Sequence, residues 1–239
     1  MNGARQGGRQ YGQADVTIPS HHPVEEFLLD YALGHLPEAW ALAVATHLTF
    51  CPACRERVAG YERMAGQAVA EAGQVPMGEG SLAAVLDRLD APPAESESPP
   101  AADHDAPVAV DGVALPAPLR HYLAAGKGGG SWRRVMSGLD EMRLPVGEEG
   151  QKAVLLRIQP GRAMPWHTHR GEEMTVVLDG GFVDASGEFR RGDCALLDSQ
   201  VDHQPVAMED RPCLCLAVTD APLKLTGPVG RWLNPLIRY

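Results

Sequence analysis

The sequence predicts an α+β protein of two domains, a small metal-stapled helical bundle followed by an all-β barrel of the jelly-roll type. Three observations favour this fold class. Apolar residues follow a helical period before residue 90 and occur in short β-rich runs after residue 111. The segment between the two regions is rich in Pro, Ala and acidic residues. One cluster of potential metal-binding side chains lies on each side of that segment.

Composition limits the partners of this protein. The chain has 239 residues and a formal net charge of -10, and its length suits one large domain or two small ones. An acidic surface repels the phosphates of nucleic acids, so we expect no direct nucleic-acid binding. No segment reaches the roughly 20 consecutive apolar residues of a membrane helix, and the N-terminal residues lack the apolar core of a signal peptide. We therefore expect a cytoplasmic protein without a membrane anchor.

The first domain is predicted to contain three or four short helices. In residues 23–34 apolar side chains recur at i, i+3, i+4 and i+7, and Gly34 is a suitable stop. The segment 37–50 opens with Pro in a favoured first-turn position and carries one apolar stripe. A third helix is expected over 52–72, and residues 81–89 offer a fourth. Such short helices form a marginal core, which a metal or a partner usually supports.

Charge and composition place the domain boundaries. We expect residues 1–18 to be a disordered tail and residues 91–110 to be a flexible, acidic Pro/Ala-rich linker, because neither can bury enough apolar surface to offset its ordering entropy. The helical domain then spans 19–90 and the barrel domain 111–239. Residues 1–90 carry 6 basic and 11 acidic side chains, whereas the barrel domain carries 15 and 16. The first domain therefore suits a basic partner.

The helical domain contains a candidate zinc site. His47, Cys51 and Cys54 lie within eight residues, across the junction of the second and third predicted helices. Two thiolates and an imidazole at this spacing suit tetrahedral zinc, and the start of a helix favours thiolates. A fourth ligand must come from elsewhere, and either His21 or His22, just before the first helix, fits the physical argument. A redox CxxC pair or two buried cysteines is the alternative interpretation.

This segment resembles the zinc-binding anti-sigma domain, whose signature is an upstream His followed by H-x3-C-x2-C. The stretch from His22 to Cys54 fits that signature. The resemblance implies His22 as the fourth ligand, a zinc-stapled helical bundle, and a mainly structural role for the metal.

After the linker the pattern becomes that of an antiparallel barrel. Short β-rich runs occupy 152–161, 174–184, 187–198 and 212–220, and turn sequences such as Gly-Gly and Ser-Gly separate them.

The barrel domain contains a second candidate metal site. His167 and His169 are two residues apart on a predicted strand, so their side chains project to the same side. Glu173 starts the next strand, and His203 follows after a hairpin. Three imidazoles and a carboxylate can hold Zn, Fe, Mn or Ni. Glu172 is the competitor to Glu173, and spacing favours Glu173.

The first part of this set matches the first cupin motif, G-x5-H-x-H-x3-E-x6-G, at every fixed position. The second cupin motif is degenerate, because Asp198 and Gln200 stand where Pro and Gly are usual. The resemblance implies a cupin barrel, a double-stranded β-helix, with the metal inside it.

Three further cysteines lie in the barrel domain. Cys213 and Cys215 share one face of a predicted strand, where core packing is favoured slightly over a redox-sensing role. Cys194 is predicted to lie in the core.

Over residues 21 to 216 the whole arrangement resembles the ChrR-type anti-sigma factors of bacteria. The ATHLTFCPAC stretch, the H-x-H-x3-E set, a His 30 residues beyond Glu173 and the following C-x-C pair all match that family. The resemblance implies a non-enzymatic inhibitor whose zinc domain binds an extracytoplasmic-function sigma factor. It also implies that the cupin senses singlet oxygen or organic hydroperoxides and triggers release.

A different class of function fits the same residues. A cupin dioxygenase or isomerase with an accessory zinc-binding helical domain is the alternative, because four protein ligands leave positions open on a six-coordinate metal. The motif offers no obvious acid-base residue beyond the ligands, which favours the regulatory interpretation.

Overall fold

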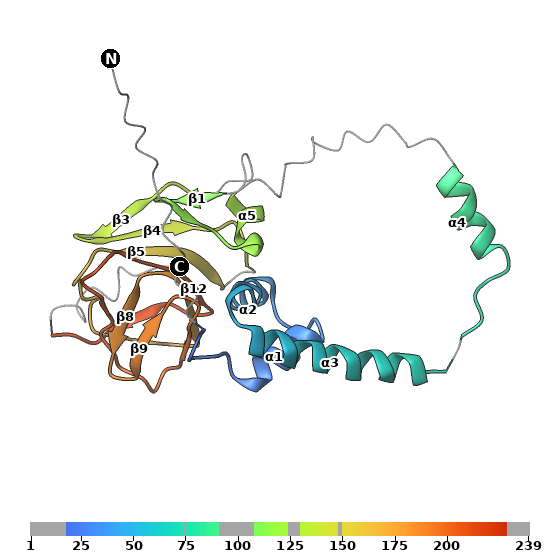
Figure 1. Cartoon of the computed structure of the whole chain (residues 1–239), viewed down its shortest axis with the longest axis horizontal. Helices are drawn as coiled ribbons and strands as arrows, with labels where there is room; N and C mark the ends of the chain where they lie inside the picture. Colours follow the sequence, from blue (N-terminus) through green and yellow to red (C-terminus); the bar gives the residue numbers. More distant parts are fainter. Residues whose placement is uncertain (1–17, 74, 91–107, 124–129, 148–149, 229–239) are drawn as a thin grey trace, which may run out of the picture.

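The computed structural model describes residues 18–73, 75–90, 108–123, 130–147 and 150–228 of the chain (Figure 1). All but the last residue of the predicted tail and most of the predicted linker lie outside these described residues. The chain is already a strand at Ala109–Val110, the last two residues of the range expected for the linker.

The helices before residue 91 lie where the sequence predicts them, including the fourth. The first ends before Gly34, which adopts a φ of +71° that other residues rarely take. Cys51 ends the second helix and caps the third, and Pro52 occupies the first turn of the third. The helices are α1 (Glu25–Ala32), α2 (Glu38–Phe50), α3 (Pro52–Glu71) and α4 (Ser81–Asp90).

The remaining described residues form the predicted antiparallel barrel. A six-stranded sheet has the order β10-β7-β12-β5-β4-β3, and a three-stranded sheet has the order β11-β8-β9. A β13-β6 pair and the β1-β2 hairpin complete the strands. The first elements are β1 (Ala109–Val110), β2 (Val113–Ala114), the unpredicted short helix α5 (Ala117–Leu123), β3 (Arg133–Met136), β4 (Leu139–Arg143) and β5 (Lys152–Ile158). They are followed by β6 (His167–His169), β7 (Glu173–Asp179), β8 (Gly181–Asp184), β9 (Gly187–Arg190), β10 (Cys194–Leu197), β11 (Val206–Ala207), β12 (Cys213–Thr219) and β13 (Leu223–Leu225).

The central strands of the six-stranded sheet are buried on both faces, although a barrel in water needs to bury only its inner face. Every residue of β12 is buried. Because side chains alternate along a strand, Cys213 and Cys215 belong to the core inside the barrel, whereas Leu214 and Leu216 belong to a second core outside it. A sheet buried on both faces must be covered by another layer.

Helix α2 provides that layer. It contacts β7 and β12 on one side and α1 and α3 on the other, and Figure 1 shows it between the barrel and the rest of the helical domain. Accordingly, side chains are buried around most of its circumference, including Trp40, Leu42 and Val44. The described parts of the two domains therefore share one continuous core.

Candidate metal centres

The helical cluster is assembled at the junction of α2 and α3. His47 lies in the last turn of α2, Cys51 lies between the two helices, and Cys54 lies in the first turn of α3. The backbone N–H of Cys54 donates a hydrogen bond to the sulfur of Cys51 over 3.4 Å. Both sulfurs are fully buried at the positive end of the α3 dipole, a position that stabilises thiolates.

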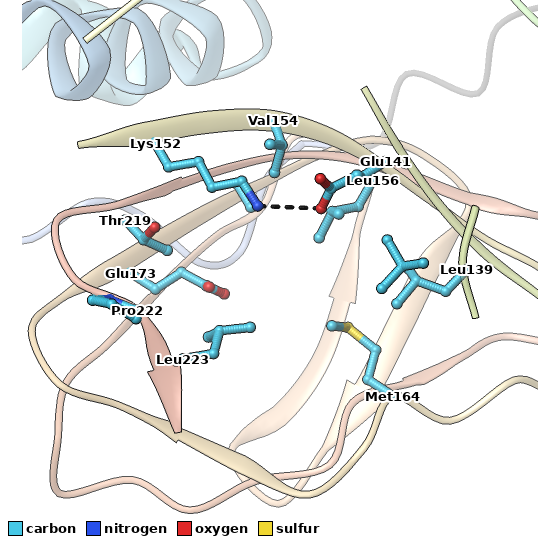
Figure 2. A pocket seen from close by; sticks show the side chains of 12 residues that line it. Leu139, Glu141, Lys152, Val154, Leu156, Met164, Glu173, Thr219, Pro222 and Leu223 are labelled. Atoms are coloured by element: carbon cyan, nitrogen blue, oxygen red, sulfur yellow. Dashed lines mark hydrogen bonds and ion pairs between the residues drawn. The ribbon is translucent and has the colours of Figure 1, made fainter. Parts of the chain in front are cut away.

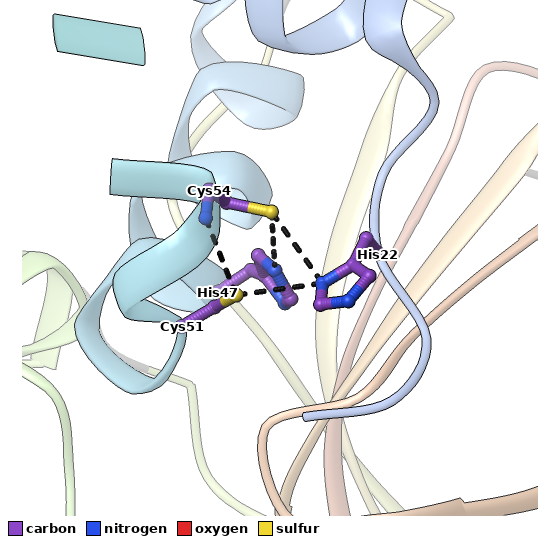
Figure 3. Close-up of side chains that lie close together, drawn as sticks. All are labelled: His22, His47, Cys51 and Cys54. Atoms are coloured by element: carbon purple, nitrogen blue, oxygen red, sulfur yellow. Dashed lines mark hydrogen bonds between the residues drawn. The ribbon is translucent and has the colours of Figure 1, made fainter. Parts of the chain in front are cut away.

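His22 completes this cluster, as Figure 3 shows. Its Nδ1 lies 3.4 Å from Sγ of Cys51 and 3.5 Å from Sγ of Cys54, and Nε2 of His47 lies 3.3 Å from Sγ of Cys54. All four donor atoms lie within 4.8 Å of one another. Zinc bonded to sulfur at about 2.3 Å and to nitrogen at about 2.0 Å holds the two atoms roughly 3.5 Å apart in a tetrahedron. The four side chains therefore fit tetrahedral zinc.

The other candidate for the fourth ligand points elsewhere. The His21 ring stacks near the Phe189 ring, with 4.3 Å between centroids, and its Nδ1 lies 3.6 Å from the carboxylate of Asp193. Of the two adjacent histidines, only His22 joins the cluster in the described structure.

In the metal-free protein His47 is in the protonation state that binds a metal, whereas Cys54 must first lose a proton. Burial lowers the pKa of His47 to about 4, so its imidazole is neutral at physiological pH and keeps a lone pair for a metal. Nδ1 of His47 lies 2.8 Å from the carbonyl oxygen of Gly192, which assigns the proton to Nδ1 and leaves Nε2 as the metal-binding atom. Burial raises the pKa of the Cys54 thiol to about 12, so metal binding must release its proton.

Acid is expected to destabilise the metal-free protein. Because burial lowers the pKa of His169, inside the barrel, from 6.5 to about 4, the folded barrel binds fewer protons than the unfolded chain between these values. The stabilisation from this group is present above about pH 6.5 and is lost as the pH falls toward 4. The melting temperature in the presence of a chelator, determined at pH values from 7 to 4, measures this loss of stability. A melting temperature that does not fall over this range would contradict the burial of a neutral imidazole.

The second cluster lies inside the barrel. His167 and His169 project together from β6, and His203 reaches them through a β-bridge in which the backbones of His167 and His203 exchange two hydrogen bonds. Nε2 of His203 lies 3.0 Å from Nε2 of His167 and 3.4 Å from Nε2 of His169. Two imidazole nitrogens bound to one ion at about 2.1 Å lie roughly 3.0 Å apart at right angles and 3.4 Å apart at the tetrahedral angle. The three imidazoles therefore fit one divalent ion.

Outer-shell contacts direct the Nε2 atoms of two of these rings inward. Nδ1 of His167 lies 2.8 Å from the carbonyl oxygen of Pro165. Nδ1 of His203 lies 2.9 Å from the carboxylate of Asp184, and both side chains are almost fully buried. Carboxylate-histidine pairs of this kind fix the tautomer of metal-binding imidazoles. Sequence analysis missed Asp184, although its position two residues after the buried Phe182 on β8 places it on the inner face.

Glu173 lies beside this cluster, outside the set of converging donor atoms. One carboxylate oxygen is 3.6 Å from Nδ1 of His169, and the other accepts a hydrogen bond from the hydroxyl of Thr175. Nδ1 of His169 is buried and has no hydrogen-bond partner in the described structure. The predicted role of Glu173 as a metal ligand therefore stays a prediction, and the structure places its carboxylate against the outer nitrogen of His169.

A cavity of about 120 Å³, whose lining residues Figure 2 shows, is bordered by Glu173, which also lies beside the second cluster. Its walls are mostly apolar, and Glu141 and Lys152 form an ion pair of 3.2 Å at its edge. Leu156, Met164 and Glu173 line both this cavity and a smaller hollow that His167 and His203 also line. A small molecule in the cavity would therefore lie close to the imidazoles.

The remaining cysteines are buried in the two cores. Cys213 and Cys215 face the interior of the barrel, and their mutual hydrogen bond together with burial raises the pKa of the Cys215 thiol. Cys194, on β10, faces away from the barrel interior and is buried in the core shared with the helices, which confirms its predicted core position. Neutral, buried thiols react slowly with oxidants, which favours the packing interpretation.

These features define a class of protein in which a helical domain with a His2Cys2 cluster that fits a metal is docked on a cupin barrel with a second, imidazole-rich cluster. None of the helices in the described part of the chain is long and apolar enough to span a membrane. Residues 129–222 match the family described as the ChrR cupin-like domain.

Two similar proteins extend this match to most of the chain. The anti-sigma-E factor ChrR of Cereibacter sphaeroides is 38% identical over 218 residues, which cover 91% of this chain and 98% of that protein. A crystal structure of Rhodobacter sphaeroides SigE in complex with the anti-sigma ChrR matches with a TM-score of 0.70 and 38% identity, over 85% of this chain and 100% of that one. The chain belongs to the ChrR family of anti-sigma factors.

Proposed function

We propose that this protein is a cytoplasmic, non-enzymatic anti-sigma factor that binds and inhibits an extracytoplasmic-function sigma factor. Zinc at His22, His47, Cys51 and Cys54 orders the binding domain, residues 19–90. The single observation that carries the proposal is the 38% identity to an anti-sigma factor over nearly the full length of both chains. The similar chain was crystallised in complex with SigE, which supports a sigma factor of that type as the partner.

The exposed apolar face of α4 supports a protein partner. Leu82, Val85, Leu86 and Leu89 follow the i, i+3, i+4, i+7 pattern, and each is at least 50% exposed. Figure 1 shows α4 away from the barrel and the other helices. A ten-residue helix is marginal in water without tertiary contacts. A sigma factor covering this stripe would stabilise α4 and gain the apolar core that a specific interface needs.

The cupin domain, residues 111–239, is the sensor in this proposal. A divalent ion, Zn or else Fe, Mn or Ni, held by His167, His169 and His203 with Glu173 alongside, would supply Lewis acidity at the end of the cavity. The apolar cavity beside the cluster has room for a small oxidant such as an organic hydroperoxide. Reaction of an organic hydroperoxide or of singlet oxygen with the cupin domain is the signal that releases the sigma factor.

Substitutions on α4 test the binding function. Replacing Leu82 and Leu89 by Gln is expected to weaken binding of a σE-type sigma factor at least about 30-fold, because central apolar anchors contribute roughly 1–2 kcal/mol or more each. Both side chains are at least 70% exposed, so the melting temperature should not change. Affinity is measured by titration of purified sigma factor into the full-length protein.

The control is Ala84→Gln, on the opposite face of the same helix. Equal affinities for both variants would refute binding through α4, and oxygen consumption by the purified protein would favour the enzymatic alternative.

A further inference from the structure

The turn between β9 and β10 of the barrel reaches into the zinc site of the helical domain. The carbonyl oxygen of Gly192 lies 2.8 Å from Nδ1 of His47, more than 140 residues away in sequence. This contact is fully buried. A donor from one domain is thus oriented by the backbone of the other.

The next residue of the turn holds the segment that carries His22. Asp193 is 3% exposed, and its Oδ1 accepts hydrogen bonds from the backbone N–H groups of Ser20 (2.7 Å) and His21 (3.0 Å). Its Oδ2 accepts a bond from the N–H of Arg190, within the turn. The N–H of Cys194 then donates to the carbonyl of His21 over 3.1 Å. Three hydrogen bonds therefore fix the chain immediately before His22.

Packing at Gly192 leaves no room for a side chain. Its φ is +92°, and an added Cβ would lie 2.8 Å from Cβ of Phe50 and from Cγ of Pro19. Phe50 immediately precedes Cys51, and Arg191 lies over its ring at 4.8 Å from the centroid. The turn is therefore in close contact with both chain segments that deliver zinc ligands.

We propose that the turn Arg190–Cys194 of the cupin domain is a positioning element of the N-terminal zinc site, so that domain docking and zinc binding depend on each other. Cys51 and Cys54 are placed by the helical domain alone. Cupin contacts orient the other two donors, His47 through Gly192 and His22 through Asp193. Outer-shell partners of this kind typically change metal affinity about 10- to 100-fold when they are lost. By linkage, loss of zinc weakens docking by the same factor.

Strand β10 links this turn to the second metal centre. The side chains of Ala195 and Leu197 line the hollow that contains His167 and His203. Cys194 and Leu196 point the other way, into the core shared with the helices. A displacement of β10 at the cupin metal would therefore move the turn that orients His47. This regulatory consequence rests on the proposed function, whereas the linkage between docking and zinc does not.

Metal competition in the full-length protein tests the linkage. Cobalt(II) bound to Cys51 and Cys54 gives thiolate charge-transfer absorption, which an imidazole-only site lacks, so titration with zinc reports the N-terminal site separately. Asp193→Ala and Gly192→Ala are expected to weaken this site about 10- to 100-fold. The matched control is Asp210→Ala, which removes an exposed carboxylate paired with Arg211. Metal occupancy of the cupin should stay unchanged. Affinities equal to that of the control would overturn the proposal.

Hydrogen exchange on the unmodified protein keeps the proposal testable even if both variants fail to fold. Removing zinc from the N-terminal site should speed amide exchange at Ser20, His21 and Cys194, whose N–H groups make the bonds between the domains. Amides at the centre of β5, which contacts β4 and β12, serve as the internal control. Exchange at the three amides that is the same with and without zinc would overturn the linkage. Both measurements report zinc affinity and domain docking, and neither depends on binding of a sigma factor. A negative result would therefore refute the linkage without contradicting the anti-sigma function. Absence of sigma-factor binding would likewise leave the linkage standing.

Discussion

Replacing Cys51 and Cys54 together by Ser is expected to abolish zinc binding in the helical domain and to make the target promoter of the sigma factor constitutively active. Structural zinc sites contribute apparent binding free energies on the order of 10 kcal/mol that are coupled to folding. The total stability of a domain is only about 5–15 kcal/mol. Loss of the metal should therefore disorder the helical domain instead of merely weakening it.

Promoter activity measured with a reporter, together with zinc content of the purified protein, checks this prediction. The matched control is Cys213→Ser, the same substitution at a buried position in the barrel outside both metal clusters. It should lower stability without releasing the sigma factor. Unchanged repression by the double variant would show that the helical surface forms without its zinc ligands.

Replacing His203 by Ala is expected to remove the metal from the cupin and to abolish the response to organic hydroperoxides, while repression without oxidant persists. His203 contacts both other imidazoles of the cluster and is oriented by Asp184, so its loss leaves only two converging imidazoles. Metal content should fall from about two ions per chain to about one, because the two sites lie in different domains.

Metal analysis and promoter activity before and after addition of hydroperoxide measure this effect. His35→Ala is the control, since the His35 side chain is 68% exposed and lies outside both clusters. A variant that still binds two ions, or that still responds to oxidant, would refute the sensor role of the cupin metal. Loss of basal repression would instead mean that the cupin metal is needed for docking itself.

The local pattern of residues was sufficient to predict the helices and the helical metal cluster. Capping and periodicity are local properties, and three of the four donors, His47, Cys51 and Cys54, lie within eight residues at one helix junction. The fourth donor could not be chosen on physical grounds, because His21 and His22 are adjacent. The choice is made by Asp193, which is remote in sequence and binds the backbone at Ser20 and His21 while His22 turns toward the cluster.

How tightly the two domains dock was not predicted, although the sequence contains a signal for close docking. In β12 the run Cys213–Val218 is apolar without alternation, and the same holds for much of β7. Such strands indicate a sheet covered on both faces. The outer-shell role of Asp184 was not predicted for a related reason, since a single acidic residue on a short strand has no local pattern that pairs it with His203.

The most direct test of the central claim is calorimetric titration of a σE-type sigma factor into the full-length protein, with and without zinc in the N-terminal site. The account predicts a tight one-to-one complex for the zinc-loaded protein, no measurable binding after zinc removal, and recovery when zinc is returned. Equal affinity in the two states would contradict it, because a zinc-independent surface would then be responsible for binding.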